Sequence, residues 1–234
     1  MKPVRRRLRP PEPRDRSRPG TGEWAAHLLL GGALLLAGCT GHVPLPSLSP
    51  QEAGRQALAE YDANHDGFLD AAELEKCPAL KRSLKAIDQN GDGRLSAQEI
   101  ADRVAGYLDS GVGLTSSVCT VYLDNRPLEG ATVVLEPEKF LGSGVKPASG
   151  VTDRDGSAAL KAEGQDLPGV QFGFYRVRIS KKDGQGRETL PARYNTQTTL
   201  GCEIAPDDPR NKRRGPGGRP REENDALIFR LTSG

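Results

Sequence analysis

The chain contains DANHDGFLDAAE at residues 62–73 and DQNGDGRLSAQE at residues 88–99, two copies of one pattern. In each copy the first, third and fifth side chains carry oxygen, glycine stands sixth and glutamate closes the stretch. A hard cation takes about six to eight oxygen ligands, and a tight loop can turn alternate side chains inward to supply them. The glycine permits the backbone reversal that such a loop needs. The pattern therefore predicts two cation-binding loops.

Both copies resemble the calcium loop of EF-hands without a gap. The resemblance implies two Ca²⁺ sites, each with side-chain oxygens, a carbonyl from the seventh residue, a ninth residue acting through water and a closing glutamate that gives two oxygens. Four carboxylates in the first loop against three in the second favour tighter binding at the first. The expected ligands are Asp62, Asn64, Asp66, Phe68, Asp70 and Glu73, then Asp88, Asn90, Asp92, Arg94, Ser96 and Glu99.

Apolar residues at helical spacing flank both loops, which predicts a small all-α pair over residues 49–109. Ser49-Pro50-Gln51-Glu52 predicts a capping box at its start. Pro78 interrupts the short segment between the loops, so we expect two very short helices with a corner at Cys77-Pro78. Leu69 and Leu95, eighth in their loops, are expected to pair as a short ladder. The compact spacing resembles EF-hand pairs of bacterial secreted proteins and, loosely, dockerin modules.

From Val118 onward apolar residues alternate with polar ones, which predicts an all-β antiparallel sandwich over residues 118–234. Expected strands cover 118–123, 131–137, 157–160, 175–179, 198–204 and 226–231. Residues 127–131, 152–156, 173–177 and 190–195 resemble the transthyretin-like, carboxypeptidase-regulatory-like domains of bacterial surface proteins. That resemblance implies a prealbumin-like, non-catalytic module. The acidic stretch at 152–156 reads as an ordinary turn or as a third calcium site.

The N-terminal residues predict export. Eight basic residues precede an apolar run at residues 24–38, as in a signal peptide, and Leu36-Ala37-Gly38-Cys39 resembles the bacterial lipobox. This predicts a signal peptide at 1–38, lipidation of Cys39, a tether at 39–48 and anchoring to a membrane at the cell envelope, in the periplasm or at the cell surface. The alternative is a plain transmembrane anchor or a buried helix.

Two further segments divide the chain. Glycines and serines at residues 110–117 predict a flexible linker, from which we expect few contacts between the two regions and a β region insensitive to calcium. Residues 206–223 are rich in Pro, Gly and Arg, which favours a disordered loop over a polyanion-binding one. Cys119 and Cys202 lie in predicted strands and are either bridged or separately buried.

Several function classes lose support. Beyond Cys39 the histidines are His42 and His65, so histidine-based catalysis and zinc binding lack their groups, and we expect no enzyme. There 25 basic residues face 28 acidic ones, a charge of about −3 that does not suit a nucleic-acid partner. The interpretation is a lipid-anchored, calcium-binding structural or binding module whose protein or polysaccharide partner is unidentified. The alternatives are a dockerin-like, calcium-dependent assembly adaptor and a carboxypeptidase-associated accessory protein.

Overall fold

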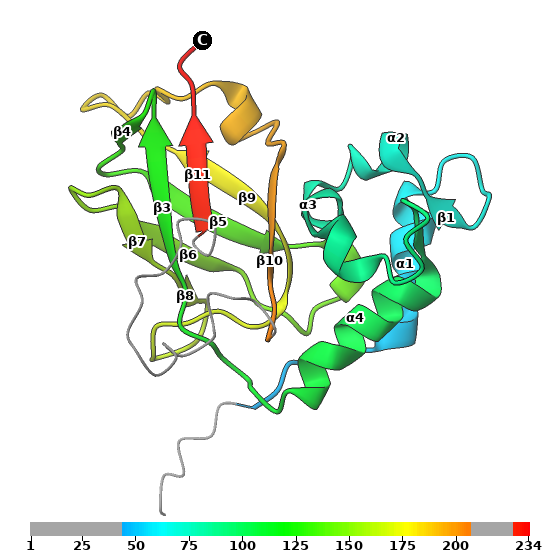
Figure 1. Cartoon of the computed structure of the whole chain (residues 1–234). Helices are drawn as coiled ribbons and strands as arrows, with labels where there is room; N and C mark the ends of the chain where they lie inside the picture. The colour runs from blue at the N-terminus through cyan, green and yellow to red at the C-terminus, as the bar shows by residue number, and fades with distance from the viewer. Residues whose placement is uncertain (1–43, 207–226) are drawn as a thin grey trace, which may run out of the picture. The chain divides into compact units, whose positions relative to one another are not determined.

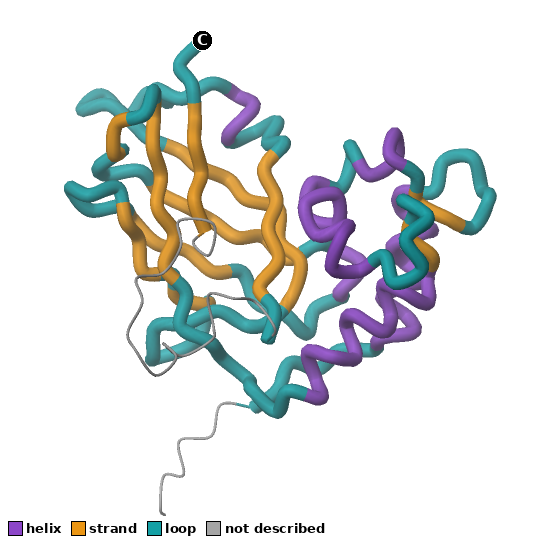
Figure 2. The backbone as a smooth tube through the Cα atoms, in the orientation of Figure 1, coloured by secondary structure: helices purple, strands orange, loops and turns teal. Residues whose placement is uncertain are grey.

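The computed structural model describes residues 44–206 and 227–234, in which a helical region precedes a β-rich region (Figures 1 and 2). The predicted signal peptide, Cys39 and nearly all of the 206–223 insertion lie outside these residues. Among the residues described, the helices are all too short or too polar to cross a membrane.

The helical region has four helices and a two-stranded ladder. A corner separates the second and third helices at Cys77-Pro78, as predicted, but the third runs for ten residues and is longer than expected. Ser49 stands at the N-cap position of the first helix, but its side chain makes no cap hydrogen bond, and Glu52 bonds Arg55 and Gln56. The predicted capping box is therefore wrong. The elements are α1 (Pro50–Tyr61), β1 (Phe68–Leu69), α2 (Ala71–Leu74), α3 (Pro78–Ile87), β2 (Leu95–Ser96) and α4 (Ala97–Asp109).

The β-rich region forms two sheets. One has the strand order β10-β9-β5-β6-β8, and the other has the order β11-β3-β4 with β7 also paired to β3. All six predicted strands are present; the sequence analysis missed three shorter ones that lack a clear apolar alternation. The elements are β3 (Val118–Leu123), β4 (Arg126–Pro127), β5 (Thr132–Pro137), η1 (Lys139–Leu141), β6 (Ala148–Val151), β7 (Ser157–Ala159), β8 (Lys161–Ala162), β9 (Gly173–Ser180), η2 (Ala192–Tyr194), β10 (Leu200–Ile204) and β11 (Leu227–Leu231).

Strand direction differs from the expectation at one pair. The five-stranded sheet is antiparallel throughout, but β11 runs parallel to β3, from Leu227 opposite Cys119 to Leu231 opposite Leu123. The expectation of a wholly antiparallel fold is therefore wrong here. Alternation of apolar residues reports which side chains are buried and carries no information on strand direction.

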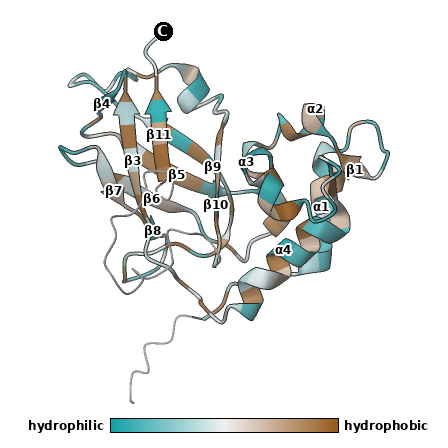
Figure 3. Cartoon of the chain, viewed as in Figure 1, coloured by the Kyte–Doolittle hydropathy of each residue, from teal (hydrophilic) through white to brown (hydrophobic). Residues whose placement is uncertain are grey.

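Buried side chains from the helices and from both sheets form one hydrophobic core, and apolar residues mark α1, α3, α4, β3, β5 and β11 (Figure 3). Opposite residues of an antiparallel pair share a face, so Gly201 lies beside Arg176, and Glu203 beside Phe174, on one face of β9 and β10. The helices contact this face, whereas Cys202 belongs to the opposite face.

The linker is packed rather than flexible. Thr115 and Val170 exchange two backbone hydrogen bonds of 2.9 and 2.8 Å, and Leu114 packs against the core. α3 also packs on β10 and α1 on η1, so the expectation that few contacts join the two regions is wrong. The same holds for the end of the predicted tether, where Pro46 is buried and Leu48 packs against the core. Composition indicated local flexibility, but burial of apolar side chains outweighs it.

Cys119 and Cys202 are buried thiols on different sheets, β3 and β10, so the structure has the unbridged alternative. Burial raises the pKa of the Cys119 thiol to about 12. A thiol with so high a pKa is almost wholly protonated at neutral pH and is a poor nucleophile.

Candidate metal centres in the helical region

Both loops reverse direction at the predicted glycines, Gly67 and Gly93, whose φ angles are 87° and 79°. These values lie in the left-handed region that glycine adopts without a steric penalty. The fourth loop position is also left-handed: φ is 59° at His65 and 75° at Gly91. The two loops therefore follow the same backbone course despite different residues at this position.

The opening aspartate of each loop organises the turn. One oxygen of Asp62 accepts the Gly67 N–H at 3.0 Å, and one oxygen of Asp88 accepts the Gly93 N–H at 2.9 Å. The other oxygen of Asp62 accepts the Asp66 N–H at 3.3 Å. These bonds hold the carboxylate over the loop interior, where the predicted ion would lie.

The next ligands use the same kind of local bond. Asn64 accepts the Asp66 N–H at 3.0 Å and Asn90 accepts the Asp92 N–H at 2.8 Å. Asp66 and Asp92 then accept the amides of the seventh residues, at 3.0 Å and 2.9 Å. Each pair thereby forms successive Asx turns that bring the third and fifth side chains to the same loop.

The closing glutamate joins the two ends of each loop. Glu73 accepts the amides of Ala63 at 2.7 Å and Asp70 at 3.1 Å, and Glu99 likewise accepts those of Gln89 at 3.1 Å and Ser96 at 2.9 Å. Both glutamates are buried. The bonds from Ala63 to Glu73 and from Gln89 to Glu99 join the second and the twelfth residue of each loop, so the glutamate holds the two ends of the loop together.

Asp70 and Ser96 have a role that the sequence analysis missed. Each caps the exit helix: Asp70 accepts the Glu73 N–H at 3.0 Å and Ser96 accepts the Glu99 N–H at 3.3 Å, and the glutamate returns a bond to the cap residue's amide. These are capping boxes, whose sequence signature of Asp or Ser followed three residues later by Glu was present in both loops.

The seventh and eighth residues join the two loops. Leu69 pairs with Leu95 in the β1–β2 ladder, which confirms the expected pairing. The Arg94 guanidinium lies 4.1 Å from the centre of the Phe68 ring, a cation–π contact between the two seventh residues. The side chains of Phe68 and Arg94 thus hold the loops together, while their carbonyls are the predicted ligands.

The donor set fits a calcium ion. Within the described ranges, no three Asp, Glu, His or Cys side chains are gathered closely enough to form a metal cluster. The loop carboxylates instead accept the loop's own amides. The two oxygens of a carboxylate offer about four lone-pair sites, so the two or three amides that a loop carboxylate accepts leave a site for a cation. The predicted ligands of both loops are all oxygen atoms, which suits Ca²⁺ rather than a soft metal.

Comparison with known proteins agrees with this geometry. The family model "EF hand" matches residues 55–78 and 80–104, which enclose both loops. A protein of Arabidopsis thaliana named "Probable calcium-binding protein CML29" is 33% identical over 72 residues, which cover 27% of this chain and 82% of the relative. The chain belongs to the EF-hand family. No solved structure matches it. Calcium is accordingly the cofactor of this EF-hand protein, at two sites.

Replacing a closing glutamate should weaken its site. We expect Glu73→Gln to raise the Kd of the first EF-hand for calcium by at least about tenfold, because it removes one of four carboxylates and a group that supplies two oxygens. Isothermal titration with calcium measures this change. Glu75→Gln is the control, since Glu75 lies just beyond the loop on the surface and pairs with Lys81. Equal affinities in Glu73→Gln and the wild type would contradict the assignment.

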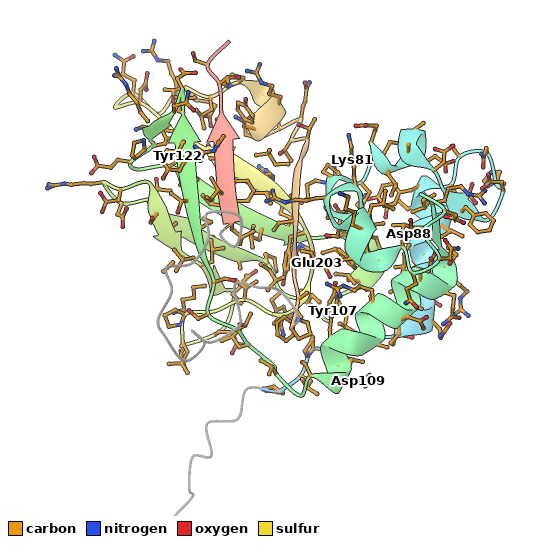
Figure 4. The ribbon with its side chains drawn as sticks, viewed as in Figure 1. Lys81, Asp88, Tyr107, Asp109, Tyr122 and Glu203 are labelled. Carbon is orange, nitrogen blue, oxygen red and sulfur yellow. The ribbon has the colours of Figure 1, made fainter. Side chains whose placement is uncertain are left out.

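The second EF-hand is attached to the β region through α4. Glu203 on β10 accepts the Tyr107 hydroxyl at 2.6 Å and forms an ion pair with Arg103 (Figure 4). The Tyr107 ring lies 5.8 Å from that of Phe174 and 6.2 Å from that of Phe172. Burial and the Glu203 carboxylate raise the pKa of Tyr107 well above its usual value, so the phenol stays a hydrogen-bond donor.

Proposed function

We propose that this EF-hand protein is an exported, lipid-anchored and non-catalytic module of the cell envelope, in which calcium stabilises a helical pair against a prealbumin-like sandwich. The burial of the EF-hand helices against the chain's own sheet supports the structural role of calcium, while export and the lipid anchor are proposed from the apolar run at residues 24–38 and from Cys39. α3 lies against β10, and α4 buries Tyr107 beside Phe174. A helix face already covered in this way favours a structural role for calcium.

The adaptor alternative has less support. A dockerin-like adaptor recruits its partner through exposed faces of the calcium-binding helices. Here Leu80 on α3 and Val104 and Tyr107 on α4 are buried in the core that the helices share with the sheets. A partner would have to displace the sheet to reach these side chains, and that would expose the apolar surface they cover.

One observation supports a prealbumin-like sandwich, and another bears on the possible third calcium site. The inner faces of the two sheets contribute to one core, as stacked sheets do. The 152–156 stretch is the turn between β6 and β7, in which Asp153 accepts the amides of Asp155 and Ser157, each at 2.9 Å. Twelve residues counted from Asp153 end at Gly164 rather than at a closing glutamate, so the stretch departs from the pattern of the two calcium loops and we favour an ordinary turn over a third calcium site.

The absence of catalysis is proposed from side-chain chemistry. In residues 44–206 and 227–234 the sole histidine is His65, which belongs to the first calcium loop. The raised pKa values of the buried Cys77 and Cys119 thiols, each about 12, make them weak nucleophiles. These features supply no activated nucleophile with an adjacent base.

Anchoring through Cys39 is tested by metabolic labelling with palmitate. We expect the wild type to take up label and Cys39→Ala to take up none, because the thiol of this residue would carry the diacylglyceryl group. Cys77→Ala is the control and should keep the label, since Cys77 is buried in the folded protein. Equal labelling of wild type and Cys39→Ala would remove the lipid anchor from the proposal.

The adaptor alternative has its own test. Capture of proteins from an envelope extract is compared with calcium and with chelator. A structural module predicts the same partners in both conditions as long as the protein remains folded, whereas an adaptor predicts a partner that is released with the calcium. A calcium-dependent partner that Glu73→Gln also loses would favour the adaptor.

A further inference from the structure

The first calcium loop is attached to the β region immediately before its opening residue. Tyr61, the last residue of α1, directly precedes the ligand Asp62. Its hydroxyl donates a 3.0 Å hydrogen bond to an oxygen of Glu138, which follows β5. Both residues are buried. One end of the loop is therefore attached to a residue 77 positions further along the chain.

The other side of the same loop is attached to the same place. The guanidinium of Arg176 on β9 donates a 3.0 Å hydrogen bond to the carbonyl of Lys76, three residues beyond the closing ligand Glu73. Another nitrogen of Arg176 lies 3.7 Å from Glu138 Oε1. Glu138 and Arg176 thus form one pair that holds the chain on both sides of the first loop.

Glu138 places a carboxylate in a buried position, which is unfavourable for its charged form. Its side chain is 3% exposed, and Oε1 accepts no hydrogen bond from any residue that the structure describes, which leaves the charge of Arg176 as its compensation. Burial raises the pKa of Glu138, while Arg176 and the Tyr61 hydroxyl act in the opposite direction. A buried carboxylate destabilises a protein unless it is paired, so a glutamine or an apolar residue would fill this position with a smaller loss of stability.

In the part of the chain that the structure describes, the second loop is attached to the β region further from its ends. Its entering helix α3 packs on β10, with the Arg82 guanidinium 5.9 Å from the centre of the Phe229 ring. Its exit helix α4 contributes Arg103 and Tyr107, which lie four and eight residues beyond the closing ligand Glu99, one and two helical turns away. A change at Glu138, which meets the chain directly before Asp62, is therefore expected to act more strongly on the first loop than on the second.

We propose that Glu138 and Arg176 are positioning residues for the first calcium site. They contact no calcium ligand; they hold Tyr61 and Lys76 so that the loop ends stay at the separation at which Asp62 and Glu73 can share one ion. Preorganising a site in this way raises affinity because less ordering remains to be done on binding. The β region thereby helps to set the calcium affinity of a loop more than 60 residues away in the sequence.

Isothermal titration with calcium tests the proposal in full-length protein whose second site is silenced by Glu99→Gln. Tyr61→Phe removes the hydroxyl, and Glu138→Gln keeps the shape but removes the charge. We expect each to raise the Kd of the first site about tenfold, the effect of about 1.4 kcal/mol. Glu129→Gln is the control: Glu129 lies on the surface of the β region and pairs with Arg154. It should leave the Kd unchanged.

Two further measurements separate positioning from general damage. In the reciprocal background, Glu73→Gln, the same variants should leave the second site's Kd unchanged. The double variant Tyr61→Phe/Glu138→Gln should lose less affinity than the sum of the two single losses, because both changes act through the group at position 138. Circular dichroism at saturating calcium checks that each variant is folded. Folded variants with unaltered first-site affinity, or with equal losses at both sites, would overturn the proposal.

Discussion

Removing calcium with a chelator is expected to lower the melting temperature of the β strands together with that of the helices, in a single transition. The physical reason is the shared core, through which loss of the helical pair uncovers Phe174 and Gly201 on the sheet. A ligand present at one hundred times its Kd contributes about 2.7 kcal/mol per site. Two sites should therefore shift the melting temperature by about 10–20 °C in a domain of this size.

Hydrogen exchange of the backbone amides of β9 and β10 measures how far removal of calcium destabilises the strands, because it reports the strands separately from the helices. The control is the Glu73→Gln/Glu99→Gln variant, in which chelator should change little because both sites are already impaired. Strands that keep the same protection in calcium and in chelator would show that the two regions unfold independently, as the Gly- and Ser-rich linker had suggested.

Gly201→Val should be among the most damaging single substitutions in the β region. A Cβ at this position would overlap the backbone of Pro78 and Ala79 at the start of α3, and neither backbone segment can move as a flexible side chain would. We expect a loss of about 3 kcal/mol of unfolding free energy, the upper end for overpacking in a core. Urea denaturation at saturating calcium measures it.

Gly106→Ala is the matched control for that substitution. Gly106 lies within α4, has open space around its Cα and has no left-handed φ, so alanine should stabilise the protein by about 0.5–1 kcal/mol. Opposite signs at Gly201 and Gly106 would assign the damage to the close approach of α3. A Gly201→Val protein as stable as the wild type would show that α3 and β10 can separate without cost.

The local features of the calcium sites were predictable from the sequence. Ligands at alternate positions and a glycine at the sixth encode the loop in twelve successive residues, so the pattern needs no distant contact to be recognised. The Leu69–Leu95 pairing followed from the equal position of the two leucines in their loops. Six strands followed from alternation, because a half-buried strand imposes a period of two on its own residues. The capping boxes at the starts of α2 and α4 have an equally local sequence signature, but the sequence analysis did not predict them.

Tertiary structure alone decided how these parts are combined. The bonds from Tyr107 and Arg103 to Glu203, and from Arg176 to Lys76, join residues 96 to 100 positions apart, and no local period records such a pairing. The parallel pairing of β11 with β3 could not be predicted for the same reason. The glycines and serines of the linker correctly indicated a backbone with no strong preference for helix or strand. Whether that backbone stays mobile depends on the surface it meets, and here burial of Leu114 and the pairing of Thr115 with Val170 hold it in place.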